Sequence, residues 1–202
     1  MNHRSMHAVR KARTEDVPQL ADTLARAFHE DPVFQWLFPV EDRRQRHSRR
    51  YFHDRVRLLL RQDEVYTVDG GVGAAMWARP GDWRDPPLAA LWSLAKLVPR
   101  IGRRSLNALG GLHEVEARHP AAPHWYLAVL GTDPARQGEG IGSALLRPVL
   151  DDCDRLELPA YLETATERNV DFYARHGFKV VDELTLPDGP HLWLMWREPV
   201  RL

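Results

Sequence analysis

The chain has 202 residues, of which 44% are hydrophobic and 28% charged, and its formal net charge is zero. This length is enough for one sizeable α/β domain, and the balanced charge provides no global field that would draw the protein to nucleic acid or to an anionic membrane. Cys153 is the only cysteine, which excludes an intrachain disulfide and a cysteine zinc cluster.

The start of the chain and its apolar segments favour a cytoplasmic protein. Residues 1–7 have no apolar core, so we expect no secretory signal there. The longest apolar stretch, Leu88 to Val98, is about half the length of a membrane span and contains Lys96. The ten histidines include no His-Glu-x-x-His pair, and no metal site is predicted.

The first half of the chain predicts a strand, two main helices and a hairpin. Asp31-Pro32 ends the first helix, because proline lacks the amide hydrogen that a helix interior needs. Gly70-Gly71 lies between two β-rich runs and predicts the hairpin turn. In chain order, these elements are expected at residues 7–12, 14–28, 41–61 and 64–78.

The second half predicts helical segments, then strands that alternate with helices, and finally an antiparallel pair. An apolar helical region in two pieces is expected to end at Gly110-Gly111, with one further turn up to Arg118. Together the elements predict one domain in which helices flank a mixed sheet. The strands are expected at 124–130, 160–163, 178–186 and 191–197, and the later helices at 143–155 and 168–176.

The turn Gln137-Gly-Glu-Gly-Ile-Gly142 joins a predicted strand to a predicted helix. Its three glycines, at alternate positions, leave no side chains between a ligand and the backbone amides. The helix that follows adds unpaired first-turn amides and the positive end of its dipole. This combination predicts a site for the diphosphate group of a cofactor.

A dinucleotide fold is one interpretation of the glycine turn. Glu163 lies 21 residues after Gly142 at the end of the next strand, where a ribose-binding acid is expected. However, the glycines are spaced as Gly-x-Gly-x-Gly rather than Gly-x-Gly-x-x-Gly. The elements that follow are a short helix and an antiparallel pair instead of further crossover units. The dinucleotide interpretation is therefore disfavoured.

The second interpretation joins the glycine turn to a later block. Gln137-x-x-Gly140-x-Gly142 is followed, one strand later, by Asn169-Val-Asp-Phe-Tyr173 and Gly177-Phe178. In this order and at this separation, the two blocks resemble the GCN5-related N-acetyltransferase superfamily. The similarity extends over most of the chain from His7 to Glu198. The segment Tyr161 to Thr164 and the proline-bounded turn at 187–190 look like puromycin N-acetyltransferase and its relatives.

The resemblance implies an α/β (α+β) fold, with a mixed, mostly antiparallel sheet of about seven strands flanked by helices. Two parallel strands, which here end near Leu130 and Glu163, splay apart and hold acetyl-CoA. Residues 1–202 are expected to form a single N-acetyltransferase domain. Its acceptor-side helices lie at about 14–62 and 86–119, and its acetyl-CoA core at about 124–180.

The resemblance also implies which residues contact acetyl-CoA. The backbone at the end of the first splayed strand pairs with the pantetheine arm, and the glycine turn binds the diphosphate. Residues of the later block complete the site. The predicted cofactor-binding residues are Val129, Leu130, Gly131, Thr132, Gln137, Gly138, Glu139, Gly140, Ile141, Gly142, Ser143, Asn169, Phe172 and Tyr173.

Two residues are predicted to be catalytic. Tyr173 is assigned as the general acid that returns a proton to the departing CoA thiolate, although a tyrosine on the core face of a helix is the alternative. Glu163 is the first candidate for the general base and His124 the second. Asp31 and Glu30 are instead predicted to attract a cationic acceptor.

Five aromatic residues have two interpretations. They line the pocket of the amine acceptor, where aromatic walls suit an amine beside an apolar body, or they pack in the core, which is the commoner place for such side chains. These residues are Phe34, Trp36, Phe38, Trp83 and Trp92.

The predicted function is acetyl transfer from acetyl-CoA to a primary amine of a small, antibiotic-like molecule, by direct attack in a ternary complex. A small-molecule acceptor is favoured because the sequence has no acidic run that would form a groove for a peptide. Two alternatives stay open: a non-catalytic module that binds or senses acyl-CoA, and acetylation of a protein or peptide amine. The protein is expected to be a monomer or a homodimer.

Overall fold

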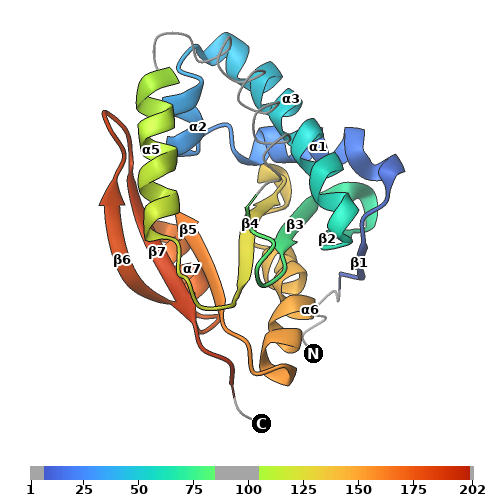
Figure 1. Ribbon diagram of the computed structural model, residues 1–202. Coiled ribbons are helices and arrows are strands. Elements are labelled where there is room, and N and C mark those ends of the chain that lie inside the picture. The colour runs from blue at the N-terminus through green and yellow to red at the C-terminus, as the bar shows by residue number, and fades with distance from the viewer. Residues whose placement is uncertain (1–6, 85–104, 201–202) are drawn as a thin grey trace.

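A seven-stranded sheet forms the centre of the computed structural model, which describes residues 7–84 and 105–200 (Figure 1). The strands lie in the order β1-β2-β3-β4-β5-β7-β6, and all neighbours are antiparallel except β4 and β5. The predicted mixed, mostly antiparallel sheet is therefore confirmed. The strands are β1 (Val9–Lys11), β2 (Val65–Val68), β3 (Gly73–Ala78), β4 (Trp125–Thr132), β5 (Ala160–Thr164), β6 (Lys179–Thr185) and β7 (His191–Arg197).

Helices cover both faces of the sheet. In the described residues they are α1 (Val17–Ala27), α2 (Pro32–Leu37), α3 (Glu41–Leu59), α5 (Ser105–Arg118), α6 (Ile141–Arg155) and α7 (Glu167–Ala174), with 3-10 turns at Thr14–Asp16, Leu60–Gln62, Asp69–Gly71 and Pro134–Arg136. The predicted segment from 86 to 104, which includes Trp92, lies outside the described residues. None of the described helices combines the length and the apolar composition needed to cross a bilayer.

Side chains of β3 point alternately into two cores, one under each layer of helices. Ala74 and Met76 belong to the core beneath α1 and α3, whereas Ala75 and Trp77 belong to the core beneath α6. This is the alternation that a strand buried on both faces requires. The two cores therefore fix α1 and α6 on opposite faces of the same strand.

Strands β4 and β5 separate soon after they meet. They pair only at Trp125 with Ala160 and at Tyr126 with Tyr161, although β4 continues along β3 as far as Thr132. The register of β4 against β3 shifts by one residue at Ala128, as in a β-bulge. Beyond Tyr126, the edge of β4 that faces β5 has no strand partner among the described residues, so the predicted splay is confirmed.

The structure confirms one prediction about a helix and contradicts another. Helix α6 runs through Pro148 as one element, in agreement with the single helix expected at 143–155. The predicted helix end at Gly110-Gly111 is wrong, because α5 runs as one helix from Ser105 to Arg118, which includes the further turn expected up to Arg118. A Cβ atom at Gly111 would lie 3.2 Å from Leu186 and 3.3 Å from Trp36. This glycine permits close packing inside the helix and does not mark its end.

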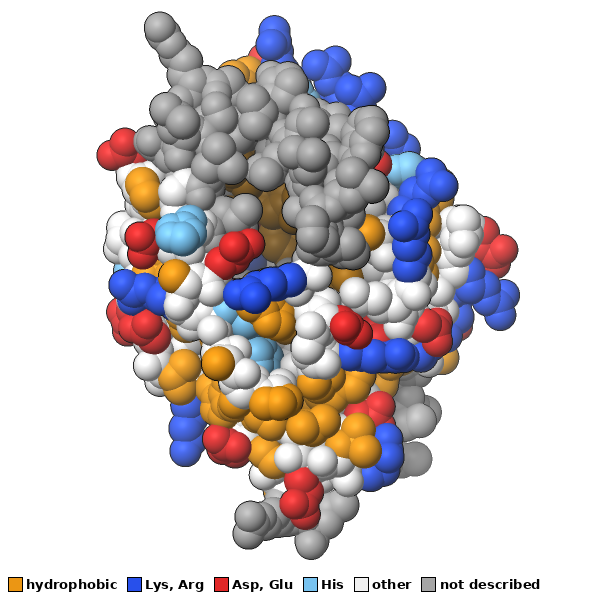
Figure 2. All heavy atoms as spheres, in the orientation of Figure 1, with side chains coloured by type: hydrophobic (Ala, Val, Ile, Leu, Met, Phe, Trp, Pro, Cys, Tyr) orange, Lys and Arg blue, Asp and Glu red, His pale blue; other side chains and the backbone are white. Residues whose placement is uncertain are grey.

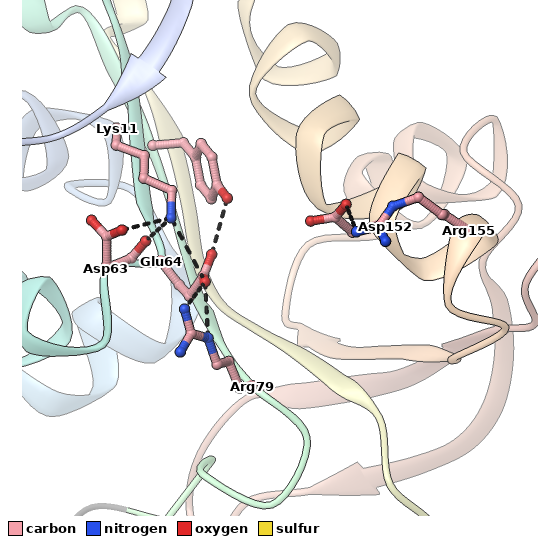
Figure 3. A network of polar contacts seen from close by, with 7 residues as sticks. Lys11, Asp63, Glu64, Arg79, Asp152 and Arg155 are labelled. Carbon is pink, nitrogen blue, oxygen red and sulfur yellow. Dashed lines mark hydrogen bonds and ion pairs between the residues drawn. The ribbon is translucent and has the colours of Figure 1, made fainter.

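A buried carboxylate joins β1, β2 and β3 at the sheet edge farthest from β6 (Figure 3). The side chain of Glu64 is 5% exposed. It accepts hydrogen bonds from Arg79 at 2.7 and 3.0 Å and from the Tyr66 hydroxyl at 2.9 Å. Lys11 lies 3.8 Å away and also contacts Asp63. Burial, followed by the charge of Glu64, raises the pKa of Tyr66, so its hydroxyl stays a donor.

Replacing Glu64 with glutamine is expected to lower the free energy of unfolding by about 1–3 kcal/mol, because charge-assisted hydrogen bonds to a buried acceptor are lost. Urea unfolding at pH 7 measures the effect. Asp63→Asn is the matched control, since Asp63 also contacts Lys11 but is 69% exposed, and it is expected to change stability by less than about 0.5 kcal/mol. Equal effects from the two variants would contradict the structural role of Glu64.

Acidic and basic side chains lie among one another on the face of the molecule shown in Figure 2, as far as its residues are described. This distribution agrees with the zero net charge. It gives this face no single sign that would steer a highly charged partner.

Candidate active site

A cleft of about 710 Å³ opens beside the free edge of β4 and the beginning of α6. Its walls also include α7 and the segment that connects α1 to α2. Twelve of the predicted site residues line this cleft: Leu130, Gly131, Thr132, Gln137, Gly138, Gly140, Ile141, Gly142, Ser143, Asn169, Phe172 and Tyr173. Residues far apart in the sequence thus meet where β4 separates from β5.

The glycine turn presents bare backbone to the cleft. Gly138 and Gly140 have φ values of 84° and 83°, a conformation that favours glycine, and a Cβ atom at either would meet nothing within 4 Å. In the described part of the chain, the amides from Gly138 to Ser143 have no backbone acceptor. These donors, at the start of a fifteen-residue helix, suit the diphosphate of CoA.

Phe172 and His176 hold α7 and the turn after it against the glycine turn. A Cβ atom at Gly142 would lie 3.2 Å from the ring of Phe172, so the two helices approach closely there. Ser143 Oγ lies 3.0 Å from His176 Nε2. Burial, followed by the positive charge of Arg175, lowers the pKa of His176. The imidazole is therefore neutral at pH 7 and forms an uncharged hydrogen bond with the serine.

Adding one methyl group at Gly142 is expected to weaken CoA binding about 10-fold, which matches the cost of roughly 1–3 kcal/mol for overpacking a tight contact. In Gly142→Ala, α7 must move away from the diphosphate site to relieve the contact with Phe172. Calorimetric titration with CoA measures the Kd. Gly110→Ala is the control, because among the described residues its Cβ atom would meet only Pro187, at 3.8 Å. An unchanged Kd for Gly142→Ala would contradict this geometry.

Tyr173 and Asp31 face the cleft from different walls. Asp31 is the N-cap of α2, where its Oδ1 atom accepts hydrogen bonds from the amides of Val33 at 2.9 Å and Phe34 at 3.2 Å. Burial raises the pKa of Asp31, against the effect of these two hydrogen bonds. Burial, followed by the charge of Asp31, also raises the pKa of Tyr173. The charge of Asp31 therefore contributes to the higher proton affinity of Tyr173.

Three predicted residues do not line the cleft. The side chain of Val129 is buried in the core formed with α1 and α3. Glu139 is exposed and accepts hydrogen bonds from Arg136 at 2.7–2.9 Å. Glu163 lies on β5, two residues beyond the last β4–β5 pair and on the same face as Tyr161.

The two candidates for the general base, Glu163 and His124, both lie close to His119. Glu163 Oε1 lies 3.7 Å from Nδ1 of His119, and His119 Nε2 lies 2.9 Å from Nε2 of His124. Burial, followed by the charge of Glu163, raises the pKa values of Tyr126 and Tyr161. The two tyrosines that flank this carboxylate therefore keep their protons.

Several lining residues were not identified as cofactor contacts from the sequence. Arg168 and Arg175 line the same wall as Asn169 and Phe172. Their spacing of seven residues, which places them on one face of a helix, was an available signal. Arg136 lies in the 3-10 turn after β4. The remaining residues not predicted to line the cleft are Ala27, Phe28 and Thr166.

Of the five aromatic residues with two interpretations, the structure describes four. Phe34, Trp36 and Phe38 are buried, and Trp83 is half-buried. Phe34 and Phe38 are buried, and Phe34 stacks on Phe52 with 5.0 Å between the ring centroids, which is core packing. Trp36 is buried in the core beneath β6 and β7. Trp83 stacks on His119, with 3.6 Å between the ring centroids. None of these four residues lines the cleft.

The sheet, the splayed parallel strands and the glycine turn at a helix start are the fold and the site of an acyltransferase. The family model described as Acetyltransferase (GNAT) family matches residues 21–178. The chain belongs to this family.

Individual relatives agree with this assignment. An uncharacterized N-acetyltransferase of Schizosaccharomyces pombe, C550.08, is 27% identical over 206 residues, which cover 95% of this chain and 83% of the relative. A Corynebacterium glutamicum structure, described as histone acetyltransferase HPA2 and related acetyltransferase, has a TM-score of 0.67 and 26% identity, covering 97% of this chain and 98% of that one. An agmatine N-acetyltransferase shares the fold, with a TM-score of 0.62, 15% identity and coverage of 95% and 98%.

Proposed function

We propose that the protein transfers an acetyl group from acetyl-CoA to a primary amine of a small molecule, by direct attack in a ternary complex. The observation that carries this proposal is the composition of the cleft. It combines unpaired amides, an open strand edge, a buried tyrosine and a carboxylate. We also propose that residues 1–202 act as one domain, since the acceptor-side helices and the cofactor core share a single sheet.

Acetyl-CoA fits the groups that the chain offers. The amides of Gly138 to Ser143 would hold the diphosphate, and the positive charges of Arg136, Arg168 and Arg175 lie along the same cleft. The free edge of β4 from Val129 to Thr132 would pair with the amides of the pantetheine arm. Asn169 would donate a hydrogen bond to that arm from α7.

Tyr173 is proposed to return a proton to the sulfur. Bound acetyl-CoA supplies an activated acetyl thioester at the splay. A phenol with an ordinary pKa of about 10 protonates a thiolate with an ordinary pKa of about 8.5 at a cost of about 2 kcal/mol. Burial raises the pKa of Tyr173 further. The same dry surroundings raise the proton affinity of a thiolate, so the difference between the two groups stays small.

Carboxylates on two sides of the splay are proposed to receive the amine. Glu30 and Asp31 line the cleft and would attract the cationic form of the acceptor. An ammonium group must lose a proton before it can attack, and Glu163 would accept that proton beside the last β4–β5 pair. Holding the amine and removing its proton are thus separate tasks.

The comparisons contain support for both kinds of acceptor. The agmatine N-acetyltransferase shows that this fold accommodates a small amine, whereas the description of the Corynebacterium structure includes a histone acetyltransferase. The zero net charge and the mixed charges on the face in Figure 2 favour a small amine over a strongly basic protein tail. Resemblance to puromycin-type enzymes adds puromycin to the acceptors to be tested.

The test measures release of CoA over a panel of acceptors, beside a binding isotherm for acetyl-CoA. The panel contains agmatine, arylalkylamines, puromycin and a lysine peptide. Transfer to one or more small amines, with a higher kcat/KM than to the peptide, is the expected result. Tight binding without transfer to any amine would instead favour an acyl-CoA sensor, and preference for the peptide would favour a protein acceptor.

A further inference from the structure

His176 reaches the cofactor cleft through the side chain of Ser143. Its Nε2 atom lies 3.0 Å from Ser143 Oγ, and Ser143 lines the cleft whereas His176 does not. Ser143 is the third residue of α6, and its backbone amide is one of the unpaired donors assigned to the diphosphate. The serine hydroxyl therefore lies between the imidazole and the group that the cleft would hold.

His176 is held in place from three other sides. Its ring packs against the ring of Phe172, with 5.0 Å between the centroids. Its amide donates a hydrogen bond to the Tyr173 carbonyl at 2.9 Å. Its own carbonyl accepts a hydrogen bond from Nε of the buried Arg197 at 3.0 Å. These contacts hold the imidazole at the C-terminal end of α7, within reach of Ser143.

The charged groups that shift the pKa of His176 are all arginines. They are Arg175 at the C-cap of α7, Arg197 of β7 and Arg147 of α6. Arg197 also donates a hydrogen bond to Asp154 of α6 at 2.8 Å. Burial, followed by these positive charges, lowers the pKa of His176. A negative charge brought to Ser143 would act in the opposite direction and stabilise the imidazolium.

The serine hydroxyl has one hydrogen to donate. If Nε2 of His176 is an acceptor, that hydrogen points to the ring, and Ser143 offers a diphosphate only lone pairs. If Nε2 carries a hydrogen, the ring donates to Oγ, and the hydroxyl hydrogen is free to turn toward a phosphate oxygen. A bound diphosphate therefore favours hydrogen on Nε2, and its negative charge favours the fully protonated ring.

We propose that His176 is a further residue of the CoA site, which takes up a proton when the diphosphate binds and turns the Ser143 hydroxyl toward it. The imidazolium donates its Nε2 hydrogen to Oγ, and Ser143 donates its own hydrogen to a phosphate oxygen. The proton comes from solvent and returns to solvent when CoA leaves. His176 is a positioning residue, because it acts through Ser143. Its role rests on the proposed use of acetyl-CoA but does not depend on which amine is acetylated.

The direction of the pH dependence follows from the two states of the ring. Burial and the arginines lower the pKa of His176 in the free protein, and the diphosphate raises it in the complex. The added affinity is therefore complete below the pKa of the free protein and is lost as the pH rises through the pKa of the complex. Binding is expected to be about 10-fold tighter at pH 6 than at pH 8, the lower end of the effect of a nearby opposite charge.

Calorimetric titration with dephospho-CoA tests the proton uptake. This ligand keeps the diphosphate but lacks the 3′-phosphate, which itself titrates at about pH 6. At pH 6.5, titrations in buffers of different ionisation enthalpy are expected to show uptake of a fraction of a proton per ligand bound. In His176→Gln this uptake is expected to fall by at least about half, with a Kd at pH 8 within about 3-fold of the original, because glutamine keeps a hydrogen-bonding group without a charge.

A second histidine at the glycine turn provides the matched control. Nε2 of His7 lies 3.2 Å from the Glu139 carbonyl oxygen, and His7→Gln is expected to leave the proton uptake unchanged. Asp31 also titrates and lines the cleft. It is present in both the unaltered chain and His176→Gln, so the uptake lost between these two proteins belongs to His176. Equal uptake by these two proteins would overturn the role of His176.

NMR of the unaltered full chain locates the proton. With ¹⁵N-labelled histidine at pH 6.5, dephospho-CoA is expected to shift the His176 nitrogens toward those of an imidazolium, with hydrogen on Nε2. A ring that stays neutral in the complex would overturn the role of His176 and leave the proposed function intact. Failure of the unaltered chain to bind dephospho-CoA and acetyl-CoA would contradict both. Binding with proton uptake but without transfer to any amine would contradict the proposed function alone.

Discussion

Tyr173→Phe is expected to lower kcat for acetyl transfer by about 10²–10⁴-fold and to leave the Kd of CoA nearly unchanged. The phenylalanine ring keeps the contacts that Tyr173 makes with Phe172, at 5.1 Å between ring centroids, and with Phe178, at 5.9 Å. Only the hydroxyl group is lost. The variant therefore removes the proton that the sulfur needs and preserves the packing of α7.

Steady-state kinetics with a fixed acceptor, together with calorimetric titration of CoA, measure the two quantities. Tyr51→Phe is the control, because Tyr51 packs against Phe34 and Phe52 in α3 and does not line the cleft. An unchanged kcat in Tyr173→Phe would assign this tyrosine to the core, which is the alternative that its 7% exposure also permits.

Local signals in the sequence were enough to predict much of the fold. The turn between β2 and β3 needs positive φ values, and Gly70 and Gly71 supply them at 76° and 60°. The start of α6 was predictable for a similar reason, because Gly140 is its N-cap with φ of 83°. In both places the conformation of one or two residues determines the local structure, so the residue type carries the information.

The arrangement of the site depended on contacts that no local pattern contains. The bulge at Ala128 and the early end of the β4–β5 pairing follow from the register of three strands. Asp31-Pro32 was predicted to end a helix, which is a local property, but only packing of the α1–α2 segment brings Asp31 into the cleft with Tyr173. His119 was not predicted at all, since a histidine after a helix has many uses and its partner lies on another strand.

The role of Asp31 leads to a prediction with opposite effects on activity and stability. Asp31→Asn is expected to lower kcat/KM for an alkyl amine, which is cationic at pH 7, by about 10–100-fold, the value of a charge-assisted contact of roughly 1.5–3 kcal/mol. Asparagine caps a helix as well as aspartate does, so the amides of Val33 and Phe34 keep an acceptor. For an aniline, which is neutral at this pH, the change is expected to be small. Glu30→Gln is the comparison, because Glu30 is 78% exposed and its charge is expected to contribute less than about 5-fold.

The raised pKa of Asp31 determines the sign of the stability change. A carboxyl group whose pKa is higher in the folded than in the unfolded protein favours folding most below its unfolded pKa, and that contribution is lost as the pH rises through the folded pKa. At pH 7 the ionised Asp31 therefore opposes folding, and Asp31→Asn is expected to keep or increase the free energy of unfolding. In the unaltered chain, KM for the alkyl amine is expected to rise as the pH falls toward the raised pKa, and in Asp31→Asn this rise is expected to disappear. A less stable variant with unchanged selectivity between alkyl amine and aniline would show that Asp31 serves only as the cap of α2.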